Sequence, residues 1–260
     1  MITDKISDIV KQASSLMAGN DFKIEEKDGV TNIVTSSDIA VQDFLVEKLG
    51  ELVPGSGFIC EEEDLRDSSE EYVWIIDPID GTQNYSRGIP DCCISVALAR
   101  NMELIAGVVY SPGRGELFRA EKGGGAFRNG KPIHVSGRDF SNSLLYTAAS
   151  TYRKEWAGYC FDIIRDIYME CNDLRRNGSA AIELCLLACG YAELYFEMRL
   201  QPWDYAAASL ILQEAGGFVA TFDGGRPSLV KGSMIVAANK KSSLDLCLEK
   251  IHKHLDKLPY

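Results

Sequence analysis

The sequence of 260 residues lacks the patterns that mark several large classes of protein. No stretch reaches about 18 uninterrupted apolar residues, so we expect no membrane-spanning helix. Residues 1–20 are polar and amphipathic, unlike the continuous apolar core of a secretory signal. Internal repeats and low-complexity linkers are also missing. We therefore expect a globular cytoplasmic protein.

Histidine is scarce, and cysteines in metal-binding spacing are absent. The chain has 3 histidines, and none of its 8 cysteines forms a CxxC motif, which argues against a zinc site. Several cysteines lie in apolar runs such as CCISVALA. We expect reduced thiols that pack as small hydrophobic side chains.

Positive charge is in deficit. Lys plus Arg number 27 and Asp plus Glu 38, which gives a net charge of −11. An acidic chain repels phosphate backbones, so we expect no nucleic-acid partner. The excess of carboxylates suits hard cations such as Mg²⁺ or Ca²⁺.

Helix-like and strand-like segments alternate in mixed order, which indicates an α/β or α+β fold with layered sheets. Helical spacing of apolar residues predicts helices over 5–17, 38–49, 159–170, 179–189, 204–215 and from 242 onward. Apolar runs predict strands over 72–76, 93–99, 103–110, 116–127 (with a glycine turn) and 192–197. The composition shifts near residues 138–142, so we expect an N-terminal half over 1–140 and a C-terminal half over 141–260.

Three acidic features are candidates for chemistry. They are the run CEEED at residues 60–64, the segment DPIDGT at residues 77–82, and Asp204 at the expected start of a helix. Each alone has an ordinary reading, as a solvated face, a turn or a helix N-cap. Together, at a strand end and a helix start, they favour a shared site.

The DPIDGT segment is the most informative of the three. It places Asp77 and Asp80 at the carboxyl end of a buried strand, where Pro78 stiffens the turn and Gly81 permits a close backbone approach. A helix opening next would offer N–H groups to a phosphate. Like charges about 4 Å apart repel by about 4 kcal/mol at an effective dielectric of about 20, so this cluster requires cations. Oxygen ligands favour Mg²⁺, with Mn²⁺ as a substitute.

Two long motifs resemble a known family. WIIDPIDGTQNY followed by RGIPDCCISVALA resembles the first signature of the inositol monophosphatase family, and PWDYAAASLILQEAGG looks like its second. Residues 115–136 are similar to the hairpin region of that family. The resemblance implies a layered αβαβα sandwich of the inositol monophosphatase and fructose-1,6-bisphosphatase type. It also implies a Mg²⁺-dependent, lithium-sensitive, homodimeric phosphatase of small phosphate monoesters.

By position in these motifs, the resemblance implies two or three Mg²⁺ ions per site. Glu61, Asp77 and the carbonyl of Ile79 would hold the first ion. Asp77, Asp80 and Asp204 would hold the second. Glu61 would also contact a third ion through water.

The resemblance further implies the groups that act on the substrate. Thr82, paired with Asp38, would orient and activate the attacking water, so that Glu61, Thr82 and Asp38 form the catalytic set. Backbone N–H groups would bind phosphate, and Glu197 would contact substrate hydroxyls. The substrate-contacting set is Asp80, Gly81, Thr82, Gly178, Ser179, Ala180, Glu197 and Asp204.

Inositol 1-phosphate is the leading substrate, because Glu197 and the pair Asn84-Tyr85 favour that branch of the family. Fructose 1,6-bisphosphate, 3′-phosphoadenosine 5′-phosphate and histidinol phosphate stay open as alternatives. From another class, a non-catalytic regulatory binding protein also stays open, since function does not follow from fold alone.

Arginines and three departures from the family pattern complete the prediction. Arg175 or Arg176 would place substrate or contact a partner subunit, and Arg176 or Arg199 would receive a second phosphate. Usual family residues are replaced at Cys60, Asn32 and Gln83. None of these departures removes a predicted ligand.

Overall fold

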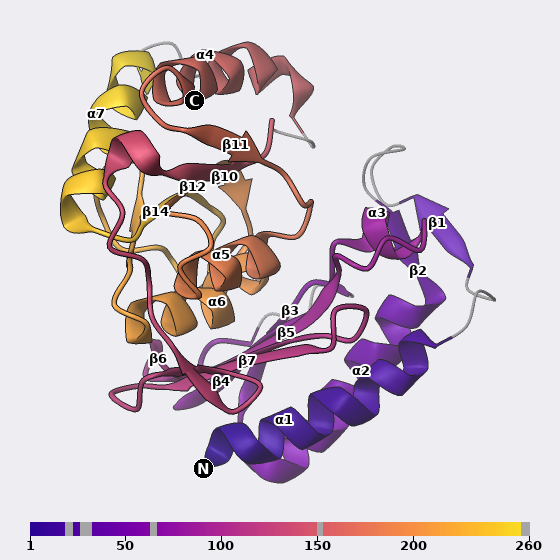
Figure 1. Cartoon of the computed structure of the whole chain (residues 1–260). Coiled ribbons are helices and arrows are strands. Elements are labelled where there is room, and N and C mark those ends of the chain that lie inside the picture. Colours follow the sequence, from indigo (N-terminus) through magenta and orange to yellow (C-terminus); the bar gives the residue numbers. More distant parts are fainter. Residues whose placement is uncertain (19–22, 27–32, 63–66, 150–152, 256–260) are drawn as a thin grey trace.

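Apolar strands between residues 57 and 133 build the larger of two main sheets (Figure 1). The computed structural model describes residues 1–18, 23–26, 33–62, 67–149 and 153–255. The seven strands follow the order β3 (Gly57–Cys60), β4 (Tyr72–Asp80), β5 (Cys93–Arg100), β6 (Glu103–Ser111), β7 (Glu116–Glu121), β8 (Ala126–Arg128) and β9 (Lys131–Ile133). Strands β3 and β4 are parallel, and every other neighbouring pair is antiparallel.

A second sheet uses strands from the later part of the chain. Its order is β11 (Asp173–Arg175), β10 (Leu144–Thr147), β12 (Leu194–Leu200), β14 (Ser233–Ala238) and β13 (Phe218–Thr221). A separate two-stranded sheet pairs β1 (Ile24–Glu26) with β2 (Ile33–Thr35). The division of the chain at residues 1–140 and 141–260 stays a prediction.

Helices cover and separate the two main sheets. The long helices are α1 (Ile2–Ala13), α2 (Ser36–Leu52), α4 (Ala157–Tyr168), α5 (Ala180–Ala188), α6 (Pro202–Glu214) and α7 (Lys241–Leu255). Helices α1 and α2 lie on one face of the larger sheet, α5 and α6 lie between the sheets, and α4 and α7 cover the outer face of the smaller sheet (Figure 1). Short turns of helix are η1 (Ser14–Met17), α3 (Thr82–Tyr85), η3 (Phe140–Asn142) and η4 (Lys154–Trp156). The expected αβαβα sandwich is confirmed.

Three apolar clusters hold the layers together. One joins α1 and α2 to the larger sheet through side chains such as Ile6, Leu45 and Trp74. A central cluster surrounds α5 and α6, and a third packs α4 and α7 on the smaller sheet. Helix α5 is buried along its whole length, as its nearly uniform apolar sequence predicts.

Two details differ from the prediction. Strand β4 was expected to end near Asp77 but continues to Asp80 through an irregularity in its pairing with β5. Helix α6 begins at Pro202 rather than Asp204, because Gln201 is the N-cap and Pro202 takes the first helical position, where a missing N–H costs nothing. Asp204 is therefore the third helical residue and not the N-cap.

The cysteines agree with the prediction of unpaired thiols. All 8 lie in the described part of the chain and are free, and 6 of them are buried. Among the described residues, no helix is long and apolar enough to cross a membrane.

Candidate active site

A cavity of about 820 Å³ opens where the larger sheet meets the N-termini of α5 and α6. Glu61 follows β3, and Asp77 lies on the parallel strand β4, so both face the same edge of the sheet. Of the predicted catalytic, ion-binding and substrate-contacting residues, all except Asp38 line this cavity. The structure thus gathers predicted site residues from five separate segments of the chain.

A β-bulge explains how Asp77 and Asp80 enter one cavity. Residues three apart in a regular strand point to opposite faces. Here Asp77 pairs with Ser95 while Asp80 pairs with Cys93, so β4 carries one extra residue over this step. Pro78, which cannot donate to the sheet, lies within the bulge, where a proline in an inner strand is tolerated. The bulge turns both carboxylates the same way.

The third carboxylate comes from α6. Asp204 Oδ2 accepts a hydrogen bond from the Gln201 backbone N–H at 2.6 Å, which fixes the side chain in the first turn of the helix. Carboxylate oxygens of Asp77, Asp80 and Asp204 lie within 4.8 Å of one another. Glu61 lines the cavity beside this group but is not part of it.

Burial and mutual repulsion dominate the electrostatics of these carboxylates. Burial and the neighbouring Glu61 raise the pKa of Asp77 well above its usual range. Burial and the neighbouring Asp80 likewise raise the pKa of Asp204. The pKa of Asp80 rises to about 6, mainly by burial. Asp77 Oδ1 is buried and, among the described residues, has no hydrogen-bond partner. An orphaned buried oxygen within an all-oxygen donor set fits a hard divalent cation.

Thr82 and Asp38 meet at the edge of the cavity. Thr82 Oγ1 is 3.4 Å from Asp38 Oδ1 and 3.0 Å from the Ile79 carbonyl oxygen. Asp38 is fully buried and also closes a capping box at the start of α2, accepting from the backbone N–H of Thr35 at 2.8 Å. Its place behind Thr82 is therefore fixed by the helix terminus.

Gly81 occupies a left-handed backbone conformation, in close contact with a neighbouring loop, that only glycine adopts without strain. Its φ is +89°, and a Cβ there would lie 2.9 Å from the Asp91 carbonyl oxygen. The chain can therefore turn from β4 into α3 while lying directly against the loop that carries Asp91.

The loop before α5 touches the carboxylate group directly. Ser179, the N-cap of α5, donates its hydroxyl to Asp80 Oδ2 at 2.5 Å, and the Ala181 N–H donates to the same oxygen at 2.8 Å. Gly178 and Ala180 flank Ser179 and line the cavity. These contacts use one oxygen of Asp80 and bring the predicted substrate loop against it.

Glu197 lies on β12 at the far side of the cavity. Its Oε2 accepts a hydrogen bond from the Tyr195 hydroxyl at 2.8 Å. Burial raises the pKa of Glu197 to about 7. A carboxyl group that can accept or donate near neutral pH is suited to binding substrate hydroxyls.

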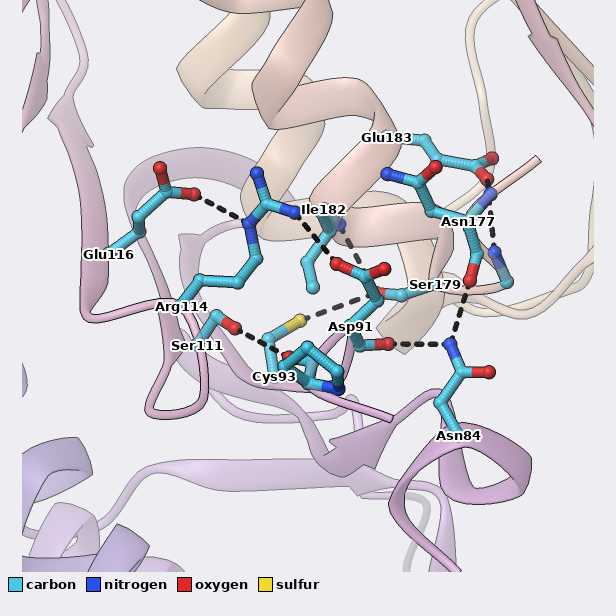
Figure 2. Close-up of polar contacts among 12 residues, drawn as sticks. Asn84, Asp91, Cys93, Ser111, Arg114, Glu116, Asn177, Ser179, Ile182 and Glu183 are labelled. Carbon is cyan, nitrogen blue, oxygen red and sulfur yellow. Dashed lines mark hydrogen bonds and ion pairs between the residues drawn. The ribbon is translucent and has the colours of Figure 1, made fainter. Parts of the chain in front are cut away.

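Three polar residues of the cavity wall were not among the predicted site residues, although Asn84 was noted for the substrate branch. They are Asn84, Glu183 and Asp91, which take part in the polar network of Figure 2. Burial raises the pKa of Glu183 to about 8. A lone acidic residue in the apolar segment AAIELCLLA is the sequence signal that would have pointed to Glu183.

The arginines separate by position. Arg176 lines the cavity, as does the unpredicted Arg87. Arg199 is exposed and is not among the residues that line it. Arg175 is exposed and pairs with Asp173 at 2.5 Å. Of the predicted acids, Glu63 and Asp64 lie outside the described residues, as does Asn32.

Comparisons with known proteins agree with this geometry. A sequence model of the inositol monophosphatase family matches residues 2–256. The chain is 36% identical over 214 residues to the inositol-1-monophosphatase of Mesorhizobium japonicum, covering 82% of this chain and 80% of that protein. It is 35% identical over 237 residues to the Nus factor SuhB of Escherichia coli K12, covering 89% of this chain and 88% of that protein.

A solved structure supports the same relationship. The extragenic suppressor protein suhB of Bartonella henselae superposes with a TM-score of 0.88 at 30% identity, covering 98% of this chain and 99% of that one. The match to the family model spans nearly the whole sequence and includes both acidic motifs. The chain belongs to the inositol monophosphatase family.

Proposed function

We propose that this protein is a Mg²⁺-dependent phosphomonoesterase that hydrolyses inositol 1-phosphate or a similar polyol phosphate. The observation that carries the proposal is the group of Asp77, Asp80 and Asp204 within 4.8 Å, at the wall of a cavity large enough for a sugar phosphate. Family membership supports a phosphatase that acts on small phosphate esters. All-oxygen donors that face a phosphate substrate favour Mg²⁺.

Four carboxylates and one carbonyl would hold the ions. Glu61, Asp77 and the Ile79 carbonyl would bind one ion, and Asp77, Asp80 and Asp204 a second. Bound Mg²⁺ would supply Lewis acidity, lowering the pKa of water and neutralising charge on the phosphate oxygens. Asp80 Oδ2 is already committed to Ser179 and Ala181, so Oδ1 is the oxygen that remains for an ion.

Thr82 and Asp38 would accept the proton that the attacking water loses. The single hydroxyl proton of Thr82 has two acceptors in reach, the Ile79 carbonyl and Asp38 Oδ1. A cation on the Ile79 carbonyl would leave Asp38 as the acceptor. Thr82 Oγ1 could then accept a hydrogen bond from water and relay its proton to Asp38 as the water attacks phosphorus. Backbone N–H groups of Gly81 and Thr82 would hold the phosphate.

The other wall of the cavity would bind the polyol. Glu197 and the loop Gly178, Ser179 and Ala180 would contact the hydroxyl groups. The family relationship also supports a lithium-sensitive, cytoplasmic homodimer that uses Mn²⁺ as a substitute metal and binds a third ion through Glu61 and water.

Glu197→Gln is expected to raise KM for inositol 1-phosphate about tenfold, because it removes a charged acceptor for the hydroxyls. An aryl phosphate, which lacks those hydroxyls, should keep its KM. Steady-state kinetics on both substrates measure the difference. An equal rise in KM for both would argue against the hydroxyl contact.

A substrate panel at saturating Mg²⁺ tests the proposed substrate. Phosphate release would be measured from inositol 1-phosphate, fructose 1,6-bisphosphate, 3′-phosphoadenosine 5′-phosphate and histidinol phosphate. The proposal predicts the highest kcat/KM for inositol 1-phosphate. A clear lead for another ester would transfer the assignment to that ester, and Arg87→Ala and Arg176→Ala would show whether the cavity arginines hold a second phosphate.

The second candidate is a non-catalytic regulatory binding protein. The observation that favours it is the similarity to a protein named Nus factor SuhB. The same panel separates the two candidates, because the regulatory reading predicts turnover of none of the four esters.

A further inference from the structure

The backbone of Asn177, in the loop before α5, is held by side chains at both its N–H and its carbonyl group. Its N–H donates to Glu183 Oε1 at 2.5 Å, and its carbonyl accepts from Asn84 Nδ2 at 2.7 Å. Figure 2 shows both contacts, with Asn84 below Asn177 and Glu183 above it. Side chains from α3 and α5, which are distant in sequence, therefore both bind this short segment of the cavity wall.

Asn84 joins two walls of the cavity. The same Nδ2 that binds the Asn177 carbonyl also donates to the Asp91 carbonyl at 2.7 Å. Asp91 is in turn anchored by Arg114, whose Nη1 donates to Asp91 Oδ1 at 2.7 Å and whose Nε donates to Glu116 at 2.8 Å (Figure 2). The Asn84 side chain thus links the substrate loop to the Asp91 loop, which Arg114 in turn connects to Glu116 on β7.

Glu183 holds the loop from the helix side. Its Oε1 also accepts the Gly178 N–H at 3.1 Å. Glu183 is 2% exposed in an otherwise apolar helix, and burying a carboxyl group there is costly unless it is bonded. Both bonds are made to backbone N–H groups that precede the helix, so the Glu183 side chain orders the loop, while Ser179 is the N-cap of α5.

The segment held by Asn84 and Glu183 lies directly before Ser179 and Ala180, which line the cavity. Gly178 has a φ of +87°, and a Cβ there would lie 3.2 Å from Asn84 Nδ2, so the loop has little room to shift toward Asn84. The next residue, Ser179, donates to Asp80 at 2.5 Å. A displacement of Asn177 would therefore reach the surface that binds the polyol.

We propose that Asn84 and Glu183 are positioning residues that clamp the loop from Asn177 to Ala180 and so set the affinity for the polyol part of the substrate. This inference rests on the proposed phosphatase function. Neither Asn84 nor Glu183 is among the groups proposed above to hold the ions, the attacking water or the phosphate. Loss of the clamp should therefore act on polyol binding, while the ion-binding carboxylates stay in place.

Two variants break the clamp in different ways. Asn84→Asp keeps the shape but replaces a donor with an acceptor between two carbonyl oxygens. Glu183→Leu removes the acceptor of two N–H groups. Glu183→Gln keeps a carbonyl oxygen in that place and should therefore preserve the hydrogen bonds to the loop. Because Glu183→Leu has the greater risk of misfolding, Asn84→Asp and Glu183→Gln keep the proposal testable.

The chain offers matched controls away from the cavity. Asn239 Nδ2 also bridges two backbone carbonyls, those of Ser136 and Arg138, each at 2.9 Å. Glu193 is 1% exposed and also accepts a backbone N–H, that of Leu144, at 2.8 Å. Glu193 also accepts the Ser136 hydroxyl at 2.7 Å and pairs with Arg138 at 2.9 Å. Asn239→Asp and Glu193→Leu therefore break buried hydrogen bonds of the same kind, the second together with an ion pair, without touching the substrate loop.

Steady-state kinetics with inositol 1-phosphate and p-nitrophenyl phosphate test the clamp. Asn84→Asp and Glu183→Leu should raise KM for inositol 1-phosphate roughly tenfold, the effect of losing a buried hydrogen bond, and leave KM for p-nitrophenyl phosphate within about threefold. Glu183→Gln should resemble the parent. The control variants should lower Tm without changing the ratio of the two KM values. Equal changes for both substrates, or a changed ratio in Asn239→Asp, would overturn the proposal.

Hydrogen exchange separates failure of the clamp from failure of the proposed function. The amides of Asn177 and Gly178 should be protected in the parent and in Glu183→Gln, and should exchange at least about tenfold faster in Glu183→Leu. If the parent hydrolyses neither ester but shows this pattern, the phosphatase proposal fails while the clamp stands. Unchanged protection in Glu183→Leu would refute the clamp even in an active enzyme.

Discussion

Asp80→Asn is expected to lower kcat/KM for inositol 1-phosphate by about a thousandfold while the fold is retained. The amide oxygen can still accept the hydrogen bonds from Ser179 and Ala181, so the loop before α5 keeps its anchor. The amide NH₂ would then face the carboxylate cluster in the place of Oδ1. The substitution therefore removes both a ligand atom and a negative charge. A thousandfold loss corresponds to about 4 kcal/mol of transition-state stabilisation, a reasonable share for a misplaced ion.

Glu193→Gln is the matched control for this variant. Glu193 is buried and, like Asp80, accepts a serine hydroxyl and a backbone N–H, from Ser136 at 2.7 Å and Leu144 at 2.8 Å. It also pairs with Arg138 at 2.9 Å, a contact in which the carbonyl oxygen of glutamine can still accept. It lies outside the cavity, so its amide variant should keep kcat/KM within a few-fold of the parent. Circular dichroism and Tm would confirm folding of both variants. Activity of Asp80→Asn within a few-fold of the parent would refute the assignment of Asp80 as an ion ligand.

Removing divalent metal is expected to make the stability of the fold fall as pH rises from about 5 to about 8. The pKa values of Asp80, Glu197 and Glu183 are raised to about 6, about 7 and about 8, chiefly by burial. In the unfolded chain such groups titrate near pH 4. The folded state therefore binds more protons than the unfolded state across this window, so the free energy of unfolding decreases with pH, on the order of 1 kcal/mol per pH unit for each buried group.

Added Mg²⁺ should reverse this trend, because ions that bind the ionised carboxylates stabilise the folded state alone. Thermal unfolding in EDTA and in excess Mg²⁺, at several values between about pH 5 and about pH 8, measures the effect. The increase in Tm should grow with pH and should shrink in Asp80→Asn. A Tm that Mg²⁺ leaves unchanged near pH 8 would contradict ion binding at this cluster.

Motif and periodicity were sufficient to predict the layered fold and the residues that converge. Asp77 and Asp80 at the end of an apolar strand, and Asp204 at the start of a helix, do meet. The sequence also indicated a reason for the convergence of Asp77 and Asp80, since Pro78 and Gly81 mark an interrupted strand followed by a tight turn. It did not reveal that β4 continues through a bulge, because strand pairing with Ser95 and Cys93 is a tertiary property.

Long-range contacts explain what the sequence left out. Asn84 and Asn177 are 93 residues apart, and no local pattern links an asparagine side chain to a distant carbonyl. Strands such as β10 and β11 have only four and three residues, too few for a periodic signal. Asp204 was placed at the N-cap because an aspartate there is common, whereas the Pro202 before it marks the true first turn.

The dependence of phosphate release on Mg²⁺ is the measurement that tests the central claim most directly. Protein stripped with EDTA would be titrated with Mg²⁺ while phosphate release from inositol 1-phosphate is followed, with Asp80→Asn as the blank. The account predicts no turnover without metal and a saturable rise with Mg²⁺ that the variant lacks. Turnover that persists in EDTA, or that responds equally to Mg²⁺ in parent and variant, would contradict it.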